Sequence, residues 1–189
     1  AIARSRGRDR LLVIEAGIEP REIPIEATDL SYVSVVGSVA VVLAAGPTRP
    51  TAVVRADLTP GVVERVREAR SLEVDPAYLS VPRFVEFPTA GGRTAFAFHY
   101  PPTNPDVVAP PGDLPPLVVI SHGGPTAHTN RRLDLEIQAF TSRGFAVVDV
   151  DYGGSTGYGR AYRQRLAGAW GVVDLEDCTA AATWLADQG

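Results

Sequence analysis

The residues best suited to chemistry lie in a glycine-rich run near the C-terminal end, from Asp151 to Gly159. Within this run, Gly153-Gly154-Ser155-Thr156-Gly157 matches the pattern G-x-S-x-G. In that pattern a sharp turn between a strand and a helix exposes the serine hydroxyl as a nucleophile. Ser155 has small neighbours, and an apolar run precedes the turn. The local pattern therefore makes Ser155 a candidate nucleophile.

The order of residues along the chain argues against this role. In α/β-hydrolases the acid and then the histidine follow the serine, whereas His99, His122 and His128 all precede Ser155. Geometry and not order defines a catalytic triad, so a triad would have to use His122 or His128. We favour the alternative that Ser155 hydrogen-bonds within its own glycine-rich turn and braces it.

A second glycine-rich loop, Ser121-His122-Gly123-Gly124-Pro125, also follows an apolar run. Open α/β sheets place their ligands beyond the C-terminal ends of such strands. Consecutive glycines let the backbone turn sharply and present free N–H groups, which an oxyanion hole requires. Gly123 and Gly124 are therefore candidate oxyanion donors, although a tight strand exit would use the same residues. We expect His122, which has no acidic neighbour in the sequence, to brace the loop through the backbone.

Composition excludes several classes of function. All 18 basic residues are arginine, so a Walker-A phosphate loop and a lysine Schiff base are excluded. A net charge of −4 does not indicate nucleic-acid binding. No apolar run reaches the roughly 20 residues of a membrane helix. We expect neither nucleic acid nor a membrane as a partner.

Metal and cofactor sites are not expected either. The three histidines are scattered without clustered Cys or Asp, so no metal site is predicted. His99 and His128 are expected to be surface or packing residues, and Cys178 a small buried residue. The glycines of Gly154-Ser-Thr-Gly157-Tyr-Gly159 stand in the reverse order of a dinucleotide fingerprint. A single cysteine excludes an internal disulfide and favours a cytoplasmic location.

The first part of the chain, residues 1–80, has the pattern of an antiparallel β segment. Short runs rich in Val, Ile and Leu recur about every ten residues between glycine and proline turns, as in a sandwich, barrel or propeller blade. The predicted strands are Leu11–Ile14, Arg21–Ile25, Val39–Ala44 and Thr51–Leu58, with Val62–Ala69 as a strand or a short helix. These strands are too few to close such an architecture, and the chain lacks methionine even at position 1. We therefore expect a piece of a longer protein.

The pattern changes after a proline-containing linker at Ser71–Pro82. A hairpin is predicted from Arg83–Phe87 and Thr94–Tyr100, followed by a proline-rich loop. Strands buried on both faces (Leu117–Ser121, Phe145–Asp151) then alternate with helices (Arg132–Ser142, Asp174–Gln188), the last of which places Leu175, Cys178, Ala182 and Leu185 on one face. Alternating strands and helices predict a parallel sheet covered on both faces.

Three stretches resemble the prolyl oligopeptidase family of serine peptidases, nearest to its acylaminoacyl-peptidase and dipeptidyl-peptidase-like branch. They are Pro116-Leu-Val-Val-Ile-Ser-His-Gly-Gly-Pro125, Gly144-Phe-Ala-Val-Val-Asp-Val-Asp-Tyr-Gly-Gly-Ser-Thr-Gly-Tyr-Gly159, and Trp170-Gly171 with Asp174 and Asp177. The resemblance implies an α/β fold in which residues 81–189 form the N-terminal part of an α/β-hydrolase domain. Residues 1–80 would be the last strands of the preceding β-propeller.

The resemblance also implies which site residues this chain contains. The catalytic Ser, Asp and His would lie beyond Gly189, so the chain alone would be inactive. Gly124, with Gly123 beside it, would supply an oxyanion donor, and His122, Pro125, Tyr152 and Ser155 would brace the loops. The partners would be a peptide substrate and the remainder of the hydrolase and propeller domains, with no cofactor. An esterase or lipase of the same fold and a non-catalytic interaction module are the alternatives.

Overall fold

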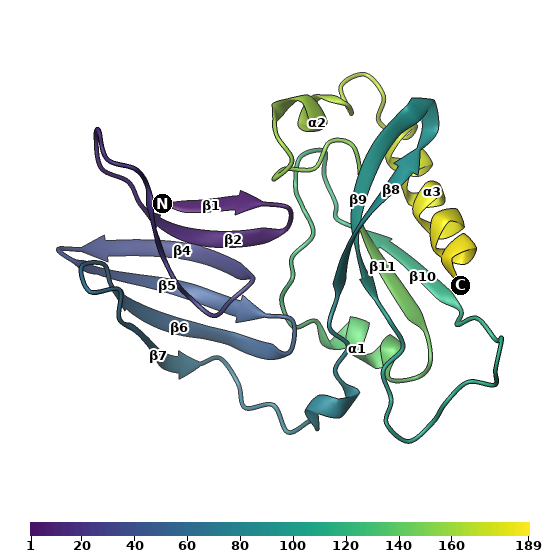
Figure 1. The fold of residues 1–189 in the computed structure, drawn as a ribbon, viewed down its shortest axis with the longest axis horizontal. Helices are drawn as coiled ribbons and strands as arrows, with labels where there is room; N and C mark the ends of the chain where they lie inside the picture. Colours follow the sequence, from purple (N-terminus) through teal and green to yellow (C-terminus); the bar gives the residue numbers. More distant parts are fainter. The chain divides into compact units, whose positions relative to one another are not determined.

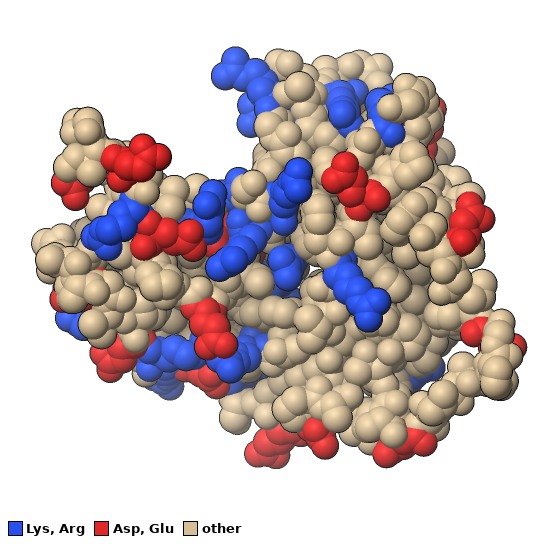
Figure 2. All heavy atoms as spheres, viewed as in Figure 1, with Lys and Arg blue, Asp and Glu red and all other residues tan.

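The computed structural model describes all residues, 1–189, and divides into two compact units. The first unit comprises Ala1–Val74 with Asn130–Leu133, and the second comprises Asp75–Thr129 with Asp134–Gly189. Figure 1 shows that strands dominate the first unit, whereas the second combines strands with helices. Basic and acidic side chains alternate with large uncharged areas on the face shown in Figure 2. No helix is long and apolar enough to cross a membrane.

The first unit consists of two antiparallel sheets. Their strands are β1 (Ile2–Ser5), β2 (Arg8–Val13) and β3 (Arg21–Ile23) in one sheet, and β4 (Asp29–Val36), β5 (Val39–Gly46), β6 (Arg49–Asp57) and β7 (Val63–Glu68) in the other. The four strands predicted from the apolar runs are confirmed with shifted ends, and the ambiguous Val62–Ala69 contains a strand. Strands β1 and β4 were not predicted, because polar residues interrupt their apolar residues.

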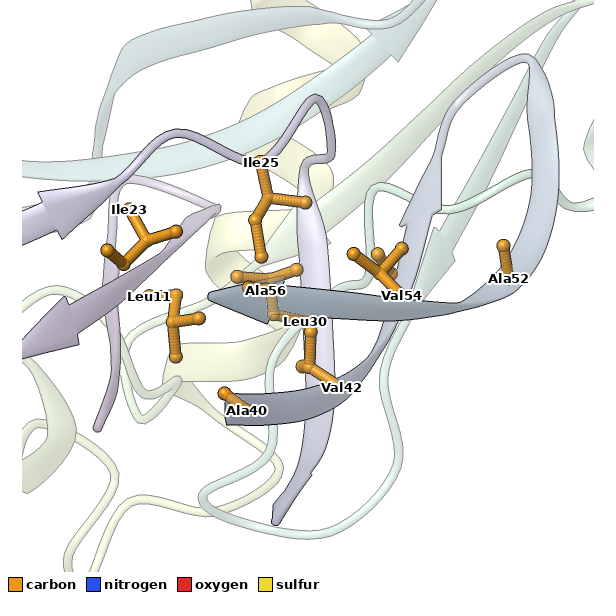
Figure 3. Packing of buried hydrophobic residues seen from close by; sticks show 10 residues of the cluster. Leu11, Ile23, Ile25, Leu30, Ala40, Val42, Ala52, Val54 and Ala56 are labelled. Carbon is orange, nitrogen blue, oxygen red and sulfur yellow. The ribbon is translucent and has the colours of Figure 1, made fainter. Parts of the chain in front are cut away.

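Small aliphatic side chains fill the core of this unit. Figure 3 shows Leu11 and Ile23 from the three-stranded sheet beside Val42 and Val54 from the four-stranded sheet. Alternate residues of β6 are buried, as the two-residue period of a strand with one buried face requires. Alanines occupy other inward positions of β5 and β6, and they are almost fully buried. The apolar alternation that predicted these strands thus also marks the core.

The second unit is built on a four-stranded mixed sheet of order β10-β11-β9-β8. Its elements are the 3-10 turn η1 (Pro76–Tyr78), β8 (Arg83–Thr89), η2 (Ala90–Gly92), β9 (Arg93–Tyr100), β10 (Leu117–Ser121), α1 (Leu135–Thr141), β11 (Ala146–Asp151), α2 (Arg160–Gln164) and α3 (Val173–Gln188). The hairpin of β8 and β9 is confirmed, with Phe84 opposite Phe98. The short helix α2 was not predicted.

Two expectations about this sheet are wrong. The sheet is not wholly parallel, because only β10 and β11 run parallel and β9 pairs antiparallel with both of its neighbours. Leu117–Ser121 is not buried on both faces, because β10 is an edge strand in this chain and Val119 is 37% exposed. A continuous apolar run indicates burial but does not identify what provides it.

Helices cover both faces of the sheet, as expected. On one face, Ile137 of α1 packs with Val147, Phe98 and Tyr100. On the other face, residues of α3 pack with Val148 and Val150. Alternating residues of β11 therefore pack against α1 on one face of the sheet and against α3 on the other. This arrangement fixes the C-terminal ends of β10 and β11, from which both glycine-rich loops leave.

The predicted buried face of α3 is partly wrong. Leu175 is 64% exposed, whereas Val173, Asp177 and Ala181 are buried. The Asp177 side chain points to the interior because it accepts hydrogen bonds from Thr89 Oγ1 and Gly153 N, both at 2.7 Å. Because the polar residue Asp177 occupies a buried position, the apolar residues of α3 do not by themselves identify its buried face.

Candidate active-site loops

The parallel pairing of β10 and β11 brings the two glycine-rich loops together. Ser121 pairs with Val150, so both strands end at the same edge of the sheet. The loop after β10 contains His122, Gly123 and Gly124, and the loop after β11 starts at Tyr152. Residues 30 positions apart in the sequence therefore lie within hydrogen-bond distance of one another.

Tyr152 holds the first loop through its hydroxyl group. This hydroxyl lies 2.6 Å from the carbonyl oxygen of Gly124 and 3.2 Å from that of His122. The rings of Tyr152 and His122 stack with their centroids 4.4 Å apart. Burial raises the pKa of Tyr152, so the hydroxyl stays protonated and can donate. Tyr152 therefore fixes the orientation of the Gly124–Pro125 peptide.

Gly124 lies at the exposed surface of the loop with φ of +75°. Only glycine adopts this left-handed region without cost, which explains its presence at this position. A Cβ atom built on Gly124 would meet nothing within 4 Å, so the space beside it is open. Gly123 is equally exposed but does not have a positive φ. The backbone of Gly124 is therefore accessible at the surface of the loop.

Ser155 does not have the surroundings of an activated nucleophile. The residue is fully buried, and its hydroxyl donates to the carbonyl oxygen of Tyr152 at 2.8 Å. His122 Nε2 lies 2.6 Å from Ser155 Oγ. Because the hydroxyl hydrogen serves the carbonyl, Nε2–H of His122 is the donor to the serine oxygen. The hydrogen bond thus runs opposite to the direction that general-base activation requires.

His122 is neutral in this environment. Burial is the largest influence and lowers its pKa, although the Gly123 carbonyl oxygen near the ring and the charge of Asp151 favour the charged form. Asp151 Oδ1 lies 4.0 Å from Nε2 of His122, beyond hydrogen-bond distance. A serine, a histidine and an aspartate therefore lie close together, but the aspartate and the serine both approach Nε2 of the histidine. In a working triad they would bind opposite nitrogens.

Asp151 instead organises the surrounding backbone. Its carboxylate accepts hydrogen bonds from Thr129 N at 2.8 Å and from the Tyr158 hydroxyl at 2.6 Å. Burial raises its pKa, and these hydrogen bonds oppose the shift. One residue thereby fixes the end of the first loop and the middle of the second. Thr156 N adds a further link to the carbonyl oxygen of Ala127 at 2.9 Å.

Pro125 and Gly154 meet where the loops cross. A Cβ atom on Gly154 would lie 3.0 Å from the Pro125 carbonyl oxygen and 2.9 Å from two carbon atoms of Leu166. Gly154 also has φ of +134°. The close approach of the two loops therefore requires glycine at this position.

The remaining candidates have no link to a reacting group. His128 Nδ1 lies 2.9 Å from Thr156 Oγ1, and His99 is half-buried in β9 with a pKa lowered by burial. Burial raises the pKa of the Cys178 thiol to about 11, so it is not reactive. No group of three His, Cys, Asp or Glu side chains is arranged to hold a metal. Sequence reasoning missed the role of Asp151, although its place at the end of a predicted strand was a usable signal.

Comparison with known proteins agrees with this architecture. Residues 131–189 match the model of the prolyl oligopeptidase family. The structure of a puromycin-hydrolysing peptidase from Mycobacterium tuberculosis superimposes with a TM-score of 0.92 at 46% sequence identity, over 97% of this chain and 29% of that one. The chain belongs to the prolyl oligopeptidase family.

Other members of the family show the same relation. A puromycin hydrolase structure gives a TM-score of 0.91 at 45% identity, covering 97% of this chain and 28% of the other. Dipeptidyl aminopeptidase BIII of Pseudoxanthomonas mexicana is 30% identical over 143 residues, which are 74% of this chain and 20% of that protein. The chain thus spans between a fifth and a third of the length of these family members.

Proposed function

We propose that this chain forms part of a serine peptidase that hydrolyses short peptides through an acyl-enzyme. In this proposal residues 81–189 are the N-terminal part of an α/β-hydrolase domain, and residues 1–80 are the end of a β-propeller. The catalytic serine, aspartate and histidine lie outside the chain. The names of its relatives, a dipeptidyl aminopeptidase and a puromycin-hydrolysing peptidase, support small peptide-like substrates.

The observation that supports this function best is that Gly124 is exposed while its carbonyl group is held by the Tyr152 hydroxyl. The Tyr152 hydroxyl binds the Gly124 carbonyl oxygen at 2.6 Å, and Gly124 is exposed with open space beside its Cα. We assign the N–H of Gly124 as one oxyanion donor. As a nucleophile attacks the scissile carbonyl carbon, negative charge develops on the carbonyl oxygen, and a fixed N–H group stabilises it without reorganisation.

The assignment of the nucleophile is tested by covalent labelling. The full-length protein is treated with a fluorophosphonate probe, and the modified serine is identified by peptide mass spectrometry. We expect one labelled serine outside residues 1–189 and no label on Ser155. Labelling of Ser155 would contradict the proposal, and the Ser155→Ala variant serves as the matched control.

The substrate class is tested separately with the same protein. We expect dipeptide p-nitroanilides to be cleaved with higher kcat/KM than p-nitrophenyl esters of short fatty acids, measured as a ratio to the uncatalysed rates. Preference for the esters would favour an esterase of the same fold. Complete inactivity of a folded protein toward both would favour an interaction module.

A further inference from the structure

Tyr158 is a residue of the second glycine-rich loop to which the proposed mechanism gives no role. Its hydroxyl lies 2.6 Å from Oδ2 of Asp151, the last residue of β11. The phenol donates and the carboxylate accepts, and hydrogen bonds to an ionised group are shorter and stronger than those between neutral groups. Tyr158 therefore makes a strong contact at the end of β11.

Aromatic packing fixes the position of the Tyr158 hydroxyl. The ring of Tyr158 stacks on that of Phe96, with the centroids 4.4 Å apart and an angle of 4° between the ring planes. The ring centroid of Tyr162 lies 5.1 Å from that of Tyr158. Phe96 pairs with Asp151 across β9 and β11. The ring and the hydroxyl of Tyr158 are therefore held at the same point of the sheet.

The same carboxylate binds the first glycine-rich loop. Asp151 Oδ1 accepts a hydrogen bond from Thr129 N at 2.8 Å, and Oδ2 accepts one from the Thr129 hydroxyl at 3.2 Å. Thr129 is the only buried residue of residues 121–129. A loop with few buried apolar contacts opens easily, so its hydrogen bonds decide how firmly it is held. Asp151 thus provides the buried attachment of this loop.

The second loop and the end of β11 hold residues 124–129 at three points. Besides the contact at Thr129, the Tyr152 hydroxyl binds the Gly124 carbonyl oxygen at 2.6 Å, and Thr156 N donates to the Ala127 carbonyl oxygen at 2.9 Å. Thr129 is the C-terminal end of this segment. A weaker contact at Thr129 therefore lets the segment that carries Gly124 move relative to β11.

We propose that Tyr158 is a positioning residue for the first glycine-rich loop, acting on Thr129 through the carboxylate of Asp151. This role rests on the proposed function, in which Gly124 supplies an oxyanion donor. The Tyr158 hydroxyl fixes the carboxylate in the orientation that receives both donors of Thr129. It also favours the ionised carboxylate, which accepts hydrogen bonds more strongly than the neutral carboxyl.

The contact makes the position of the loop depend on pH. The titratable groups around Asp151 are His122, Asp149, Tyr152, Tyr158 and Tyr162. Burial raises the pKa of Asp151, whereas the hydrogen bonds from Tyr158 and Thr129 lower it. Without the Tyr158 hydroxyl the pKa of Asp151 rises further, so the carboxyl takes up its proton at a higher pH. Thr129 is then held less firmly on the acid side.

The test compares Tyr158→Phe with the unchanged full-length protein, using a dipeptide p-nitroanilide from about pH 5 to about pH 8. The variant keeps the ring stacked on Phe96 and loses the hydroxyl alone. We expect kcat to fall about tenfold at the acid end, the equivalent of one hydrogen bond, and much less at the alkaline end. The KM should change less than kcat, because no contact with the substrate is removed. The ratio of the two kcat values is taken at each pH, because titrations common to both proteins cancel in it.

Tyr162→Phe is the matched control for this change. Its hydroxyl belongs to the same aromatic cluster, but it binds the main-chain carbonyl oxygen of Asp151 at 2.5 Å and not the carboxylate. The kcat ratio of Tyr162→Phe should therefore not depend on pH. A second control places Tyr158→Phe in an Asp151→Asn background, where the side chain does not titrate. There the kcat ratio with and without the Tyr158 hydroxyl should also be independent of pH.

Hydrogen exchange followed by mass spectrometry measures the position of the loop without hydrolysis. At about pH 6, the peptide that contains Thr129 should exchange faster in Tyr158→Phe than in the unchanged protein, and Tyr162→Phe should not have this effect. Inactivity of the unchanged full-length protein toward peptides would contradict the proposed function. The exchange measurement would then still decide whether Tyr158 holds the loop.

Three results would overturn the proposal. A kcat ratio of Tyr158→Phe that stays constant with pH would remove the link to the ionisation of Asp151. The same pH dependence in Tyr162→Phe, or its persistence in the Asp151→Asn background, would show a general loosening of the aromatic cluster. Unchanged exchange of the Thr129 peptide in Tyr158→Phe would show that the loop is held without this hydroxyl.

Discussion

Ser155 Oγ lies 2.6 Å from His122 Nε2, yet its hydroxyl hydrogen points to the carbonyl oxygen of Tyr152. The pair therefore connects two loops, and its hydrogen bond runs opposite to the direction that activation of the serine requires. His122 leads into the glycine-rich loop after β10, and Ser155 belongs to the turn after β11. In this chain the G-x-S-x-G pattern lies where the loops after β10 and β11 pack against each other, and their close approach at Gly154 leaves no room for a side chain.

The Ser155→Ala variant should keep most of the hydrolytic activity of the full-length protein. The change removes one buried hydroxyl and leaves Nε2–H of His122 without its acceptor, so a moderate loss of stability of about 1–3 kcal/mol is expected. Steady-state kinetics and chemical denaturation measure the two effects separately. Loss of activity by a factor of a thousand or more in a folded variant would make Ser155 a catalytic residue.

The Gly124→Val variant should lower kcat by roughly a hundredfold or more in the full-length protein. A β-branched residue at a φ of +75° is strained and would change the orientation of the N–H group. An interaction made mainly in the transition state affects kcat more than KM. Kinetics with a dipeptide p-nitroanilide measure this effect.

Gly112→Val is the matched control for Gly124→Val. Gly112 also has a positive φ, +88°, and open space around it, but it lies in the proline-rich loop between β9 and β10. It should have similar backbone strain and normal kcat. Near-normal turnover in Gly124→Val, or an equal loss in both variants, would contradict the assignment of Gly124 as an oxyanion donor.

The Tyr152→Phe variant should lower kcat about tenfold, the equivalent of one hydrogen bond. It loses the contact of 2.6 Å to the Gly124 carbonyl oxygen but keeps the ring stacked on His122. The KM should change less than kcat, because the ground-state contacts of the substrate are not removed. Tyr78→Phe removes another hydroxyl contact in the same unit, to Asp106, and should leave kcat unchanged. An unchanged kcat in Tyr152→Phe would show that the loop keeps its position without the hydroxyl.

Local sequence patterns predicted the elements of the fold where the apolar residues follow a simple period. The hairpin of β8 and β9 and the buried strand β11 are examples, because their side chains alternate between two apolar layers. The patterns failed at β10, whose apolar residues resemble those of β11 although the strand is at an edge of the sheet. Burial depends on neighbours that a single segment does not specify.

The candidate site was predictable in part for a similar reason. Both glycine-rich loops were identified from the strands that precede them, since parallel strands place such loops at one edge. The partners within the site were not predictable. The contacts of Asp151 with Thr129 and of His122 with Ser155 join residues 22 and 33 positions apart. Such pairs depend on the register between β10 and β11, which the sequence pattern alone does not determine.

The Asp177→Ala variant should destabilise the protein by about 2 kcal/mol, because it leaves the buried N–H of Gly153 without an acceptor. The lost hydrogen bond to Thr89 Oγ1 adds to this effect. Urea denaturation of the full-length protein measures the change in the free energy of unfolding. Asp187→Ala, an exposed position on the same helix, is the control and should differ little from the unchanged protein. Equal stability of the two variants would show that water satisfies Gly153 N.

Asp149 should make stability depend on pH between about 4 and 7. Burial raises the pKa of this carboxyl to about 7, with the charges of Asp151 and Asp134 adding to the shift. A carboxyl with a raised pKa binds its proton more tightly in the folded state than in the unfolded state. Its contribution is therefore fully present below the unfolded pKa, near 4, and decreases as the pH rises through 7.

The Asp149→Asn variant removes this titration while keeping a side chain of similar size. Compared with the unchanged protein, we expect it to be increasingly more stable as the pH rises from 4.5 to 8, with the difference levelling off above about 7.5. Denaturation midpoints at five pH values measure the difference between the two proteins, and Asp113→Asn, in an exposed loop, is the control. A difference that stays constant across this range would place the pKa of Asp149 near its ordinary value. A difference of opposite sign, with the variant losing stability as the pH rises, would show that the ionised carboxylate of Asp149 is stabilised in the folded protein.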